Sequence, residues 1–515
     1  MKVSIDGKNV TIEDVVAVAR DRIPVTISEE SEKDVRRTRE TLEHLVEKQN
    51  TIYGVTTGFG ALGNVNIRPE DLKRLQINLI RSHSSGVGTP LSQDETRALM
   101  LLRANTLAKG HSGVHLRTLE TLVEMINKGV HPIIPEKGSV GASGDLAPLS
   151  HMSLVMIGEG EAELNGELMN GSEAMRRAAI TSLTLDFKEG LALNNGTQMM
   201  TAIASLAVHD AVNLVRAAEV AGALSLEALC GIIDAFDERI HSVRPHSGQI
   251  ETAANIRQLL AGSKLVRSGK DSMNQGSYPQ DPYSLRCIPQ VLGTVRDIIG
   301  YVRNVVKVEL NSATDNPLIF SKEEACLSGG NFHGQPVSAA MDFLSIALAT
   351  LGNLSERRTA RLLDGNLSRG LPLFLVADKA KQGLQSGFMT LQCTAAALAS
   401  ENKSLAHPAS VDSIPTSANF EDFVSMGPVA ARKATEILRN CEYIVAIELL
   451  TAAQAVEFRG TNKLGNGTKE AHRILRSQVS VLKEDRAAYQ DIERVKDLIK
   501  HRKLSDLKAL SSARH

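Results

Sequence analysis

The 515 residues include 58 Lys and Arg and 59 Asp and Glu, a net charge of −1 that gives no electrostatic reason to expect a nucleic acid or an anionic membrane as partner. Hydrophobic residues make up 42% of the chain and aromatic ones 3%, with no Trp, which is typical of a soluble globular protein with an aliphatic core. The five cysteines are scattered without metal-ligand spacing, and the N-terminal segment MKVSIDGKNV lacks the apolar run of a signal peptide. We therefore expect reduced thiols, no metal and a cytoplasmic location.

The first part of the chain carries a helix signal and a glycine-rich loop. Thr11 followed by Asp14 resembles a helix N-cap, which predicts an amphipathic helix after a short extended start. The segment Gly58–Gly63 matches the spacing of a dinucleotide-binding fingerprint, but it lacks a βαβ context and an acidic residue about 20 positions further on. We interpret it as a tight-turn loop near a site.

Helical periodicity dominates the rest of the chain. Val337, Ala340, Leu344 and Leu351 keep the spacing of three and four that marks one face of a helix. Other stretches, such as Met199–Val208, are apolar nearly all round, which predicts burial among other helices or in a subunit interface. We expect a mainly α fold, built as an oligomeric bundle of long helices.

The predicted organisation has two parts. Residues 1–190 form a smaller, loop-rich N-terminal part that carries the site-forming loops, and residues 191–515 form the long-helix bundle and the C-terminal helices. Gly190–Val208 lacks charge, but the polar segment Asn194–Gln198 interrupts it, so we expect no membrane span there.

One short segment has unusual backbone chemistry available to it. Gly and Ser dominate Gly138–Ser150, and such clusters usually form flexible turns. Within it, the amide nitrogen of Gly144 is free of Cβ crowding and could close on the carbonyl carbon of Ala142. Loss of two waters, one of them using the Ser143 hydroxyl, would leave a 4-methylidene-imidazol-5-one ring. From these residues alone, a flexible turn and this cyclisation are both open.

A series of segments then identifies a family. In order along most of the chain, they are Tyr53–Gly60, Ser82–Gly88, Gly141–Ser150, Asn195–Thr197, Gln280–Cys287, Gly330–His333 and Val411–Asn419. With them the chain resembles the aromatic amino-acid ammonia-lyase family, and most closely its histidine-specific members. The resemblance implies a long-helix bundle of the ammonia-lyase and fumarase type, and a homotetramer whose sites draw on three chains.

The resemblance also implies a reaction and its catalytic groups. The expected activity is the non-oxidative elimination of ammonia from L-histidine to give trans-urocanate, with the ring formed from Ala142, Ser143 and Gly144 as electrophile. Tyr53 matches the family's base, and its pKa, near 10 for a free phenol, must be lowered for that role. Glycine amides in the Tyr53 loop are predicted to lower it.

Further residues match positions that surround the electrophile and the substrate. Arg286 matches the anchor of the substrate carboxylate, since a planar guanidinium binds that group through two hydrogen bonds. Asn195 matches the residue that holds the carbonyl oxygen of the ring, and Phe332 matches the residue that packs beside it. Tyr283, with a catalytic role, and Gln280 match residues around the electrophile and the amine.

Substrate choice is expected to depend on two positions. Ser82 and His83 resemble the pair found in histidine-specific members, where phenylalanine-specific relatives carry Phe-Leu and tyrosine-specific ones His-Leu. Glu421 matches the acidic residue that meets the imidazole. A buried Glu and His favour a ring that forms hydrogen bonds, because a phenyl ring would leave both polar groups unpaired.

The chain departs from the histidine pattern at several positions, namely Thr56, Gly334, Gln335, Phe420 and Phe423. The family usually has Gln and His where this chain has the two phenylalanines beside Glu421. The alternatives are therefore a phenylalanine or tyrosine ammonia-lyase, a 2,3-aminomutase with the same cofactor, or an inactive lyase-like helical scaffold. The fumarase and aspartase group is disfavoured because its Gly-Ser-Ser-x-Met-Pro-x-Lys loop is absent.

Overall fold

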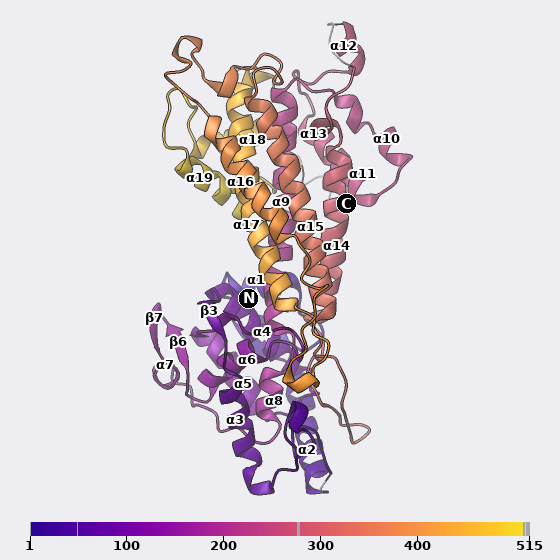
Figure 1. The fold of residues 1–515 in the computed structure, drawn as a ribbon, viewed down its shortest axis with the longest axis vertical. Coiled ribbons are helices and arrows are strands. Elements are labelled where there is room, and N and C mark those ends of the chain that lie inside the picture. The colour runs from indigo at the N-terminus through magenta and orange to yellow at the C-terminus, as the bar shows by residue number, and fades with distance from the viewer. Residues whose placement is uncertain (1, 49, 275–278, 508–509, 511–515) are drawn as a thin grey trace. The chain divides into compact units, whose positions relative to one another are not determined.

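The computed structural model describes residues 2–48, 50–274, 279–507 and 510, and helices dominate it (Figure 1). The chain divides into two compact units. The first unit comprises Met1–His209, Val302–Asp342 and Pro408–Arg432, and the second comprises Asp210–Tyr301, Phe343–His407 and Lys433–His515. The mainly α fold with long helices is confirmed. The division after residue 190 stays a prediction about domain organisation.

The first unit contains many of the shorter helices. The hydroxyl of Thr11 accepts a hydrogen bond from the Asp14 backbone, and the Asp14 side chain accepts one from the Thr11 backbone, so the predicted cap begins the first helix. Every residue from Thr96 to Ala108 in α4 is buried, which makes this helix part of the core. The helices are α1 (Ile12–Ala19), α2 (Glu29–Glu47), α3 (Leu72–His83), α4 (Gln93–Ala108), α5 (Leu116–Lys128), α6 (Leu146–Met156), α7 (Gly171–Arg177) and α8 (Glu189–Asn194).

Short strands join loops of the first unit to one another. β1 and β2 pair in parallel, β4, β6 and β7 form an antiparallel sheet, and β8 pairs antiparallel with β9. β3 pairs antiparallel with β5, with Val87 opposite Lys137, and this brings the segment after His83 beside the loop that contains Ser143. The strands are β1 (Val3–Ile5), β2 (Val25–Ile27), β3 (Val87–Pro90), β4 (Val130–Pro132), β5 (Pro135–Lys137), β6 (Glu161–Leu164), β7 (Glu167–Asn170), β8 (Leu318–Phe320) and β9 (Ala325–Leu327).

Long helices supply the core of the second unit. Parts of α9, α15 and α17 lie side by side there (Figure 1) and share a buried polar cluster. The guanidinium of Arg358 donates to the carboxylate of Glu448, which also accepts from the hydroxyls of Ser225 and Ser355. All four side chains are buried, so each polar group depends on the others for its hydrogen bonds. The long helices are α9 (Gln198–Ala228), α14 (Ile288–Glu309), α15 (Gln335–Leu363) and α17 (Gly427–Glu457).

The other helices of the second unit are shorter. α18 and α19 each bury one side and expose charged residues on the other. The bounds are α10 (Glu238–Ser242), α11 (Ser247–Leu259), α12 (Gly269–Asn274), α13 (Tyr283–Arg286), α16 (Met389–Leu405), α18 (Asn466–Gln478) and α19 (Tyr489–Lys500).

α15 carries a long apolar stretch and a buried face. Val337, Ala340, Leu344 and Leu351 are all buried, which confirms the predicted face. Among the described residues, this one helix is long and apolar enough to cross a membrane, and 61% of its apolar window is buried inside the protein. Core helices meet the same criterion, so length and composition alone are weak evidence for a span.

Candidate active site

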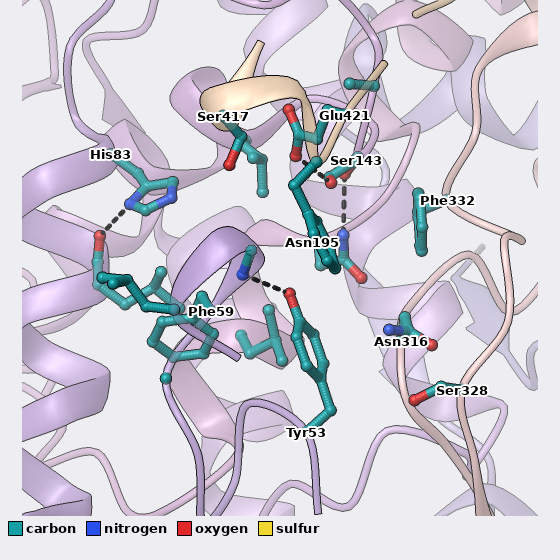
Figure 2. A pocket seen from close by; sticks show the side chains of 18 of the residues that line it. Tyr53, Phe59, His83, Ser143, Asn195, Asn316, Ser328, Phe332, Ser417 and Glu421 are labelled. Atoms are coloured by element: carbon teal, nitrogen blue, oxygen red, sulfur yellow. Dashed lines mark hydrogen bonds between the residues drawn. The ribbon is translucent and has the colours of Figure 1, made fainter. Parts of the chain in front are cut away.

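A pocket of about 810 Å³ lies in the first unit, and its walls come from stretches far apart in the sequence (Figure 2). The loop after α2 contributes Tyr53, the end of α3 contributes His83, and the loop before α6 contributes Ser143. Residues in the ranges 316–333 and 417–423 complete the wall. A cavity of this size is typical of a site for a small molecule.

The loop with Ser143 is held in a tight turn against the segment that joins α8 to α9. Gly144 has a φ of +73°, and a Cβ on it would overlap the carbonyl of Gly196. The same carbonyl oxygen accepts a hydrogen bond of 2.6 Å from the Asp145 amide. Only glycine fits this position, because both the backbone angle and the close approach exclude a side chain.

Asn195 reaches across to this loop from the end of α8. Its Nδ2 donates to the carbonyl oxygen of Ser143 over 2.9 Å (Figure 2). The side chain is 4% exposed, and its Oδ1 has no hydrogen-bond partner among the residues that the structure describes. An amide donor fixed in a buried place is suited to stabilise negative charge on the oxygen that it faces.

Tyr53 lies in the turn after α2, with its phenol oxygen in the pocket. The Gly60 amide donates to this oxygen over 2.7 Å, so the glycine-rich loop does supply the predicted donor (Figure 2). The pKa of Tyr53 is nevertheless raised, because burial opposes the charged phenolate, and Glu421 adds to the rise while the Gly60 amide only partly offsets it. The Gly60 amide thus acts in the predicted direction, but in the single chain it does not bring the pKa of Tyr53 below that of an ordinary phenol.

His83 ends α3 and faces the pocket as a neutral ring. Burial lowers its pKa, with Leu79 and Glu421 only partly opposing the shift. Nδ1 lies 3.0 Å from the carbonyl oxygen of Leu79, and since a carbonyl only accepts, Nδ1 carries the hydrogen. Nε2 of the neutral ring is then left as a hydrogen-bond acceptor.

Glu421 lies close to Ser143, on a turn with unusual backbone angles. One carboxylate oxygen accepts from the Ser143 hydroxyl over 2.8 Å, and the other accepts from the Thr416 hydroxyl over 2.8 Å. Between Thr416 and Glu421, the residues Ser417, Ala418 and Asn419 all have positive φ, at 52°, 53° and 65°. This left-handed turn is costly for residues with side chains, so surrounding contacts must hold it in place.

Two phenylalanines flank the carboxylate of Glu421. Phe420 and Phe423 line the pocket and are 60% and 61% exposed, respectively. The Phe423 ring stacks on His333, with 6.0 Å between centroids and 19° between planes. This part of the pocket wall is therefore apolar on both sides of an acidic group.

The charged groups of the pocket wall are acidic. Among the described residues that line it, Glu421 and Asp422 are carboxylates, and none is Lys or Arg. Across all of the residues that the structure describes, no cluster of three or more His, Cys, Asp or Glu side chains is arranged to hold a metal ion. A carboxylate-bearing ligand would thus need its cationic partner from elsewhere.

A family model described as aromatic amino acid lyase matches residues 10–477. The chain belongs to this family. Histidine ammonia-lyase from Caldanaerobacter subterraneus subsp. tengcongensis is 56% identical to it over 507 residues, which cover 98% of each chain. The resemblance predicted from the sequence is thereby confirmed, and the chain is assigned to the carbon–nitrogen lyases.

Solved structures of the aromatic amino acid lyase type superpose closely on the chain. Tyrosine aminomutase from Streptomyces globisporus gives a TM-score of 0.95 at 42% identity, with 99% of each chain covered. Histidine ammonia-lyase from Trypanosoma cruzi gives 0.91 at 41% identity, covering 99% of this chain and 95% of that one. These likenesses confirm the predicted ammonia-lyase fold.

Three residues that match this family's site motifs lie in the second unit and are not among the residues that line the pocket. Tyr283 and Arg286 both belong to α13, where the Arg286 guanidinium lies 4.7 Å from the centre of the Tyr283 ring. Tyr283 is 70% exposed, and Gln280 is exposed beside it. Asp281 fixes this segment, because it accepts hydrogen bonds of 2.6 Å from Arg369 and from the Ile232 amide.

Some pocket residues were not predicted from the sequence. On α3, the side that faces the pocket includes Leu75, Asn78 and Leu79, besides the predicted Ser82 and His83. Their helical spacing of three and four was available as a signal, since it continues to His83. Asn316 and Ser328 carry no such pattern, and only the packing of distant stretches brings them to the pocket.

Proposed function

We propose that the protein eliminates ammonia from L-histidine and releases trans-urocanate, with a 4-methylidene-imidazol-5-one formed from Ala142, Ser143 and Gly144 as its electrophile. The observation that carries this proposal is the hydrogen bond from Asn195 to the Ser143 carbonyl oxygen. That oxygen is the one that becomes the carbonyl of the ring. The near full-length similarity to enzymes named histidine ammonia-lyase supports the choice of substrate.

The loop fits the ring on structural grounds. The left-handed Gly144, packed against Gly196, has the compact backbone that brings its nitrogen toward the Ala142 carbonyl carbon. Closure of that bond expels one water, which carries the Ala142 oxygen, and loss of the Ser143 hydroxyl with its α-hydrogen expels the second. When present, the ring supplies an electrophilic carbon that bonds the substrate amine and makes it a better leaving group.

Tyr53 is the proposed base for the β-hydrogen of the substrate. Its oxygen lies in the pocket and accepts the Gly60 amide, a contact that stabilises the phenolate. Burial raises the pKa of Tyr53, so a nearby cation is needed to bring the phenolate within reach of neutral pH. The ammonium group of the substrate and Arg286 of a neighbouring copy are the proposed cations.

His83 and Glu421 are the proposed partners of the imidazole ring. The neutral His83 offers Nε2 as an acceptor, and Glu421 offers carboxylate oxygens, so both suit a ring that donates N–H groups. One oxygen of Glu421 is bound to the Ser143 hydroxyl, and ring formation would remove that hydroxyl and free the oxygen for the substrate. A phenyl ring would leave both acceptors buried and unpaired, which costs binding free energy.

The carboxylate of the substrate has no cationic partner in the wall of the pocket. We propose that Arg286 supplies it from a neighbouring copy, together with Gln280 and Tyr283, in a cytoplasmic homotetramer of the kind that the resemblance implies. The high exposure of Tyr283 in the single chain supports a role in contacts between copies. Phe332 and Asn195 are the proposed residues that pack beside the ring and hold its oxygen.

The test combines mass and product analysis. The purified protein is expected to weigh two waters less than its sequence, and to form urocanate and ammonia from L-histidine. A Ser143→Ala variant should keep the full mass and release no urocanate. Conversion of tyrosine into its β-isomer instead would favour the aminomutase alternative, which the likeness to tyrosine aminomutase raises. An unmodified mass in the wild-type protein would contradict the proposal and favour an inactive scaffold.

A further inference from the structure

A buried arginine on α4 holds the segment that carries Asn195. We propose that Arg103 is a positioning residue for the reaction, because it fixes the peptide between Asn195 and Gly196 so that the Asn195 amide stays on the Ser143 carbonyl oxygen. The inference rests on the proposed function and adds a residue that none of the family motifs contains.

Arg103 lies on α4 and all of its hydrogen bonds run to one short segment. Its Nη1 donates to the carbonyl oxygen of Asn195 over 2.9 Å and to Oε1 of Gln198 over 2.7 Å. Its Nη2 donates to the carbonyl oxygen of Ala192. The planar guanidinium therefore joins the end of α8 to the start of α9, and its fixed geometry sets where the linking residues lie.

The charge of Arg103 has no carboxylate partner among the described residues. The nearby carboxylate of Asp315 forms its ion pair with Lys188 over 2.7 Å, and both of these side chains are fully buried. Burial lowers the pKa of Arg103 to about 10, with Asp315 partly opposing the shift, so the guanidinium remains charged at neutral pH. A buried cation is costly unless polar groups surround it, and here the oxygens of residues 192, 195 and 198 are those groups.

The packing between Arg103 and the Ser143 loop leaves little room for displacement. Gly196 lies so close that a Cβ on it would be 2.5 Å from Nη1 of Arg103. On its other side, the carbonyl oxygen of Gly196 accepts the Asp145 amide over 2.6 Å. The peptide that positions Asn195 is thus held between the guanidinium and the loop, and a shift of either would move the Asn195 amide relative to Ser143.

The same helix offers a matched control. Arg97 is also buried on α4, and burial also lowers its pKa to about 10. Its guanidinium donates to the carbonyl oxygens of Val18 over 2.9 Å and of Ile126 over 2.8 Å, and neither residue lines the pocket. Arg97→Lys therefore measures the general cost of replacing a buried arginine in α4.

The experiment compares Arg103→Lys with Arg97→Lys in the full-length protein. Lysine keeps the charge but cannot reach the three acceptors with one planar group. We expect kcat with L-histidine to fall about 100-fold in Arg103→Lys, with KM changed less than about threefold, because displacement of a catalytic group by about 1 Å costs that much. We expect both variants to keep the mass deficit of two waters, and Arg97→Lys to keep kcat within about threefold of the wild type, as a substitution remote from the reacting atoms should.

A double-mutant cycle tests whether Arg103 acts through Asn195. The losses from Arg103→Lys and Asn195→Ala should not add, because the second substitution removes the group that the first displaces. If Arg103→Lys fails to fold, Gln198→Leu provides the same test, since it removes one acceptor of the guanidinium and should lower kcat by about tenfold through a smaller displacement.

A second readout does not depend on histidine. The proteins are treated with borohydride, and its uptake by the peptide that contains Ala142–Gly144 is measured by mass spectrometry. This uptake should be at least about tenfold slower in Arg103→Lys than in the wild type, because Asn195 stabilises the negative charge that the addition places on the Ser143 oxygen. Inactivity of the wild type toward histidine would overturn the proposed function but leave this comparison intact. Four results would each overturn the inference. They are additive losses in the double-mutant cycle, equal losses of kcat in both lysine variants, a missing mass deficit in Arg103→Lys alone, and an unchanged rate of borohydride uptake.

Discussion

The Asn195 amide donates to the Ser143 carbonyl oxygen over 2.9 Å, and this contact links the end of α8 to the loop proposed to form the electrophile. It explains why two motifs separated by about fifty residues belong to one site. In the proposed ring, negative charge would collect on this oxygen when the methylidene carbon, formerly Cβ of Ser143, accepts a nucleophile.

Removal of the Asn195 amide should lower kcat more than it weakens substrate binding. We expect Asn195→Ala to lower kcat by about 100- to 1000-fold, the cost of losing one donor to a developing negative charge. Asn194→Ala is the control, because Asn194 is also buried but binds the Ser150 hydroxyl instead. Steady-state assays of both variants check the prediction, and similar kcat losses in the two would contradict it.

Gly144→Ala should block formation of the ring. The added Cβ would overlap the Gly196 carbonyl at a backbone angle that favours glycine, so the loop would have to open. Mass spectrometry of the peptide that contains the substitution should show no loss of two waters. Gly166→Ala provides the control, because Gly166 also has a positive φ, of 81°, but nothing lies within 4 Å of the added Cβ. A two-water deficit in Gly144→Ala would refute the proposed fit.

Tyr53→Phe should abolish turnover without unfolding the protein. In the wild type, kcat/KM should rise with pH through the neutral and alkaline range, because a base acts only when deprotonated and the pKa of Tyr53 is raised by burial. The rise of kcat with pH should lie at lower pH than the rise of kcat/KM, since the substrate ammonium favours the phenolate in the complex. Tyr443→Phe, in the second unit, should leave the pH dependence of both kcat and kcat/KM unchanged. A pH-independent wild-type rate, or near-normal turnover in Tyr53→Phe, would be incompatible with Tyr53 as base.

His83→Leu should reduce the preference for histidine over phenylalanine. The substitution removes the Nε2 acceptor, so kcat/KM with histidine is expected to fall by about 100-fold or more. For phenylalanine, it removes a polar group that the phenyl ring would leave unpaired. Burial lowers the pKa of His83, so protonation of its ring should add to the loss of histidine turnover only on the acid side. His44→Leu, on the exposed side of α2, is the control. An unchanged ratio of the two substrates would contradict the role of His83.

Asp315→Asn should destabilise the protein strongly. It would leave the ammonium of Lys188 fully buried without its counter-charge, at a cost of about 3–5 kcal/mol. The double substitution Lys188→Met with Asp315→Leu should be much less harmful, because it removes both members of the ion pair and leaves neither charge without the other. Thermal unfolding at one fixed protein concentration checks the order of the three proteins. Equal midpoints for the single and double variants would contradict it.

Sequence patterns predicted the features of the fold that depend on residues close to one another in the chain. The cap formed by Thr11 and Asp14 depends on residues three apart, and the buried face of α15 follows from helical spacing alone. Both were therefore visible in the sequence. The left-handed turn at Ser417–Asn419 was not, because none of its residues is glycine and only contacts from elsewhere hold such angles.

Many residues of the candidate site could be predicted from the sequence, but their burial and supporting contacts could not. Motifs named Tyr53, Ser143, Asn195 and Glu421, and the structure gathers these around one pocket. The raised pKa of Tyr53 and the supporting contacts of Arg103 depend on burial, which no motif encodes. The roles of Gln280, Tyr283 and Arg286 stay predictions, because they concern contacts between copies of the chain.

The most direct measurement of the central claim is a competition assay. L-Histidine, L-tyrosine and L-phenylalanine are supplied together at equal concentration, and each product is quantified with the ammonia released. We predict that urocanate and ammonia form in equal amounts while the other two amino acids remain. Consumption of tyrosine or phenylalanine with histidine left intact would contradict the assignment of His83 and Glu421 as partners of an imidazole ring.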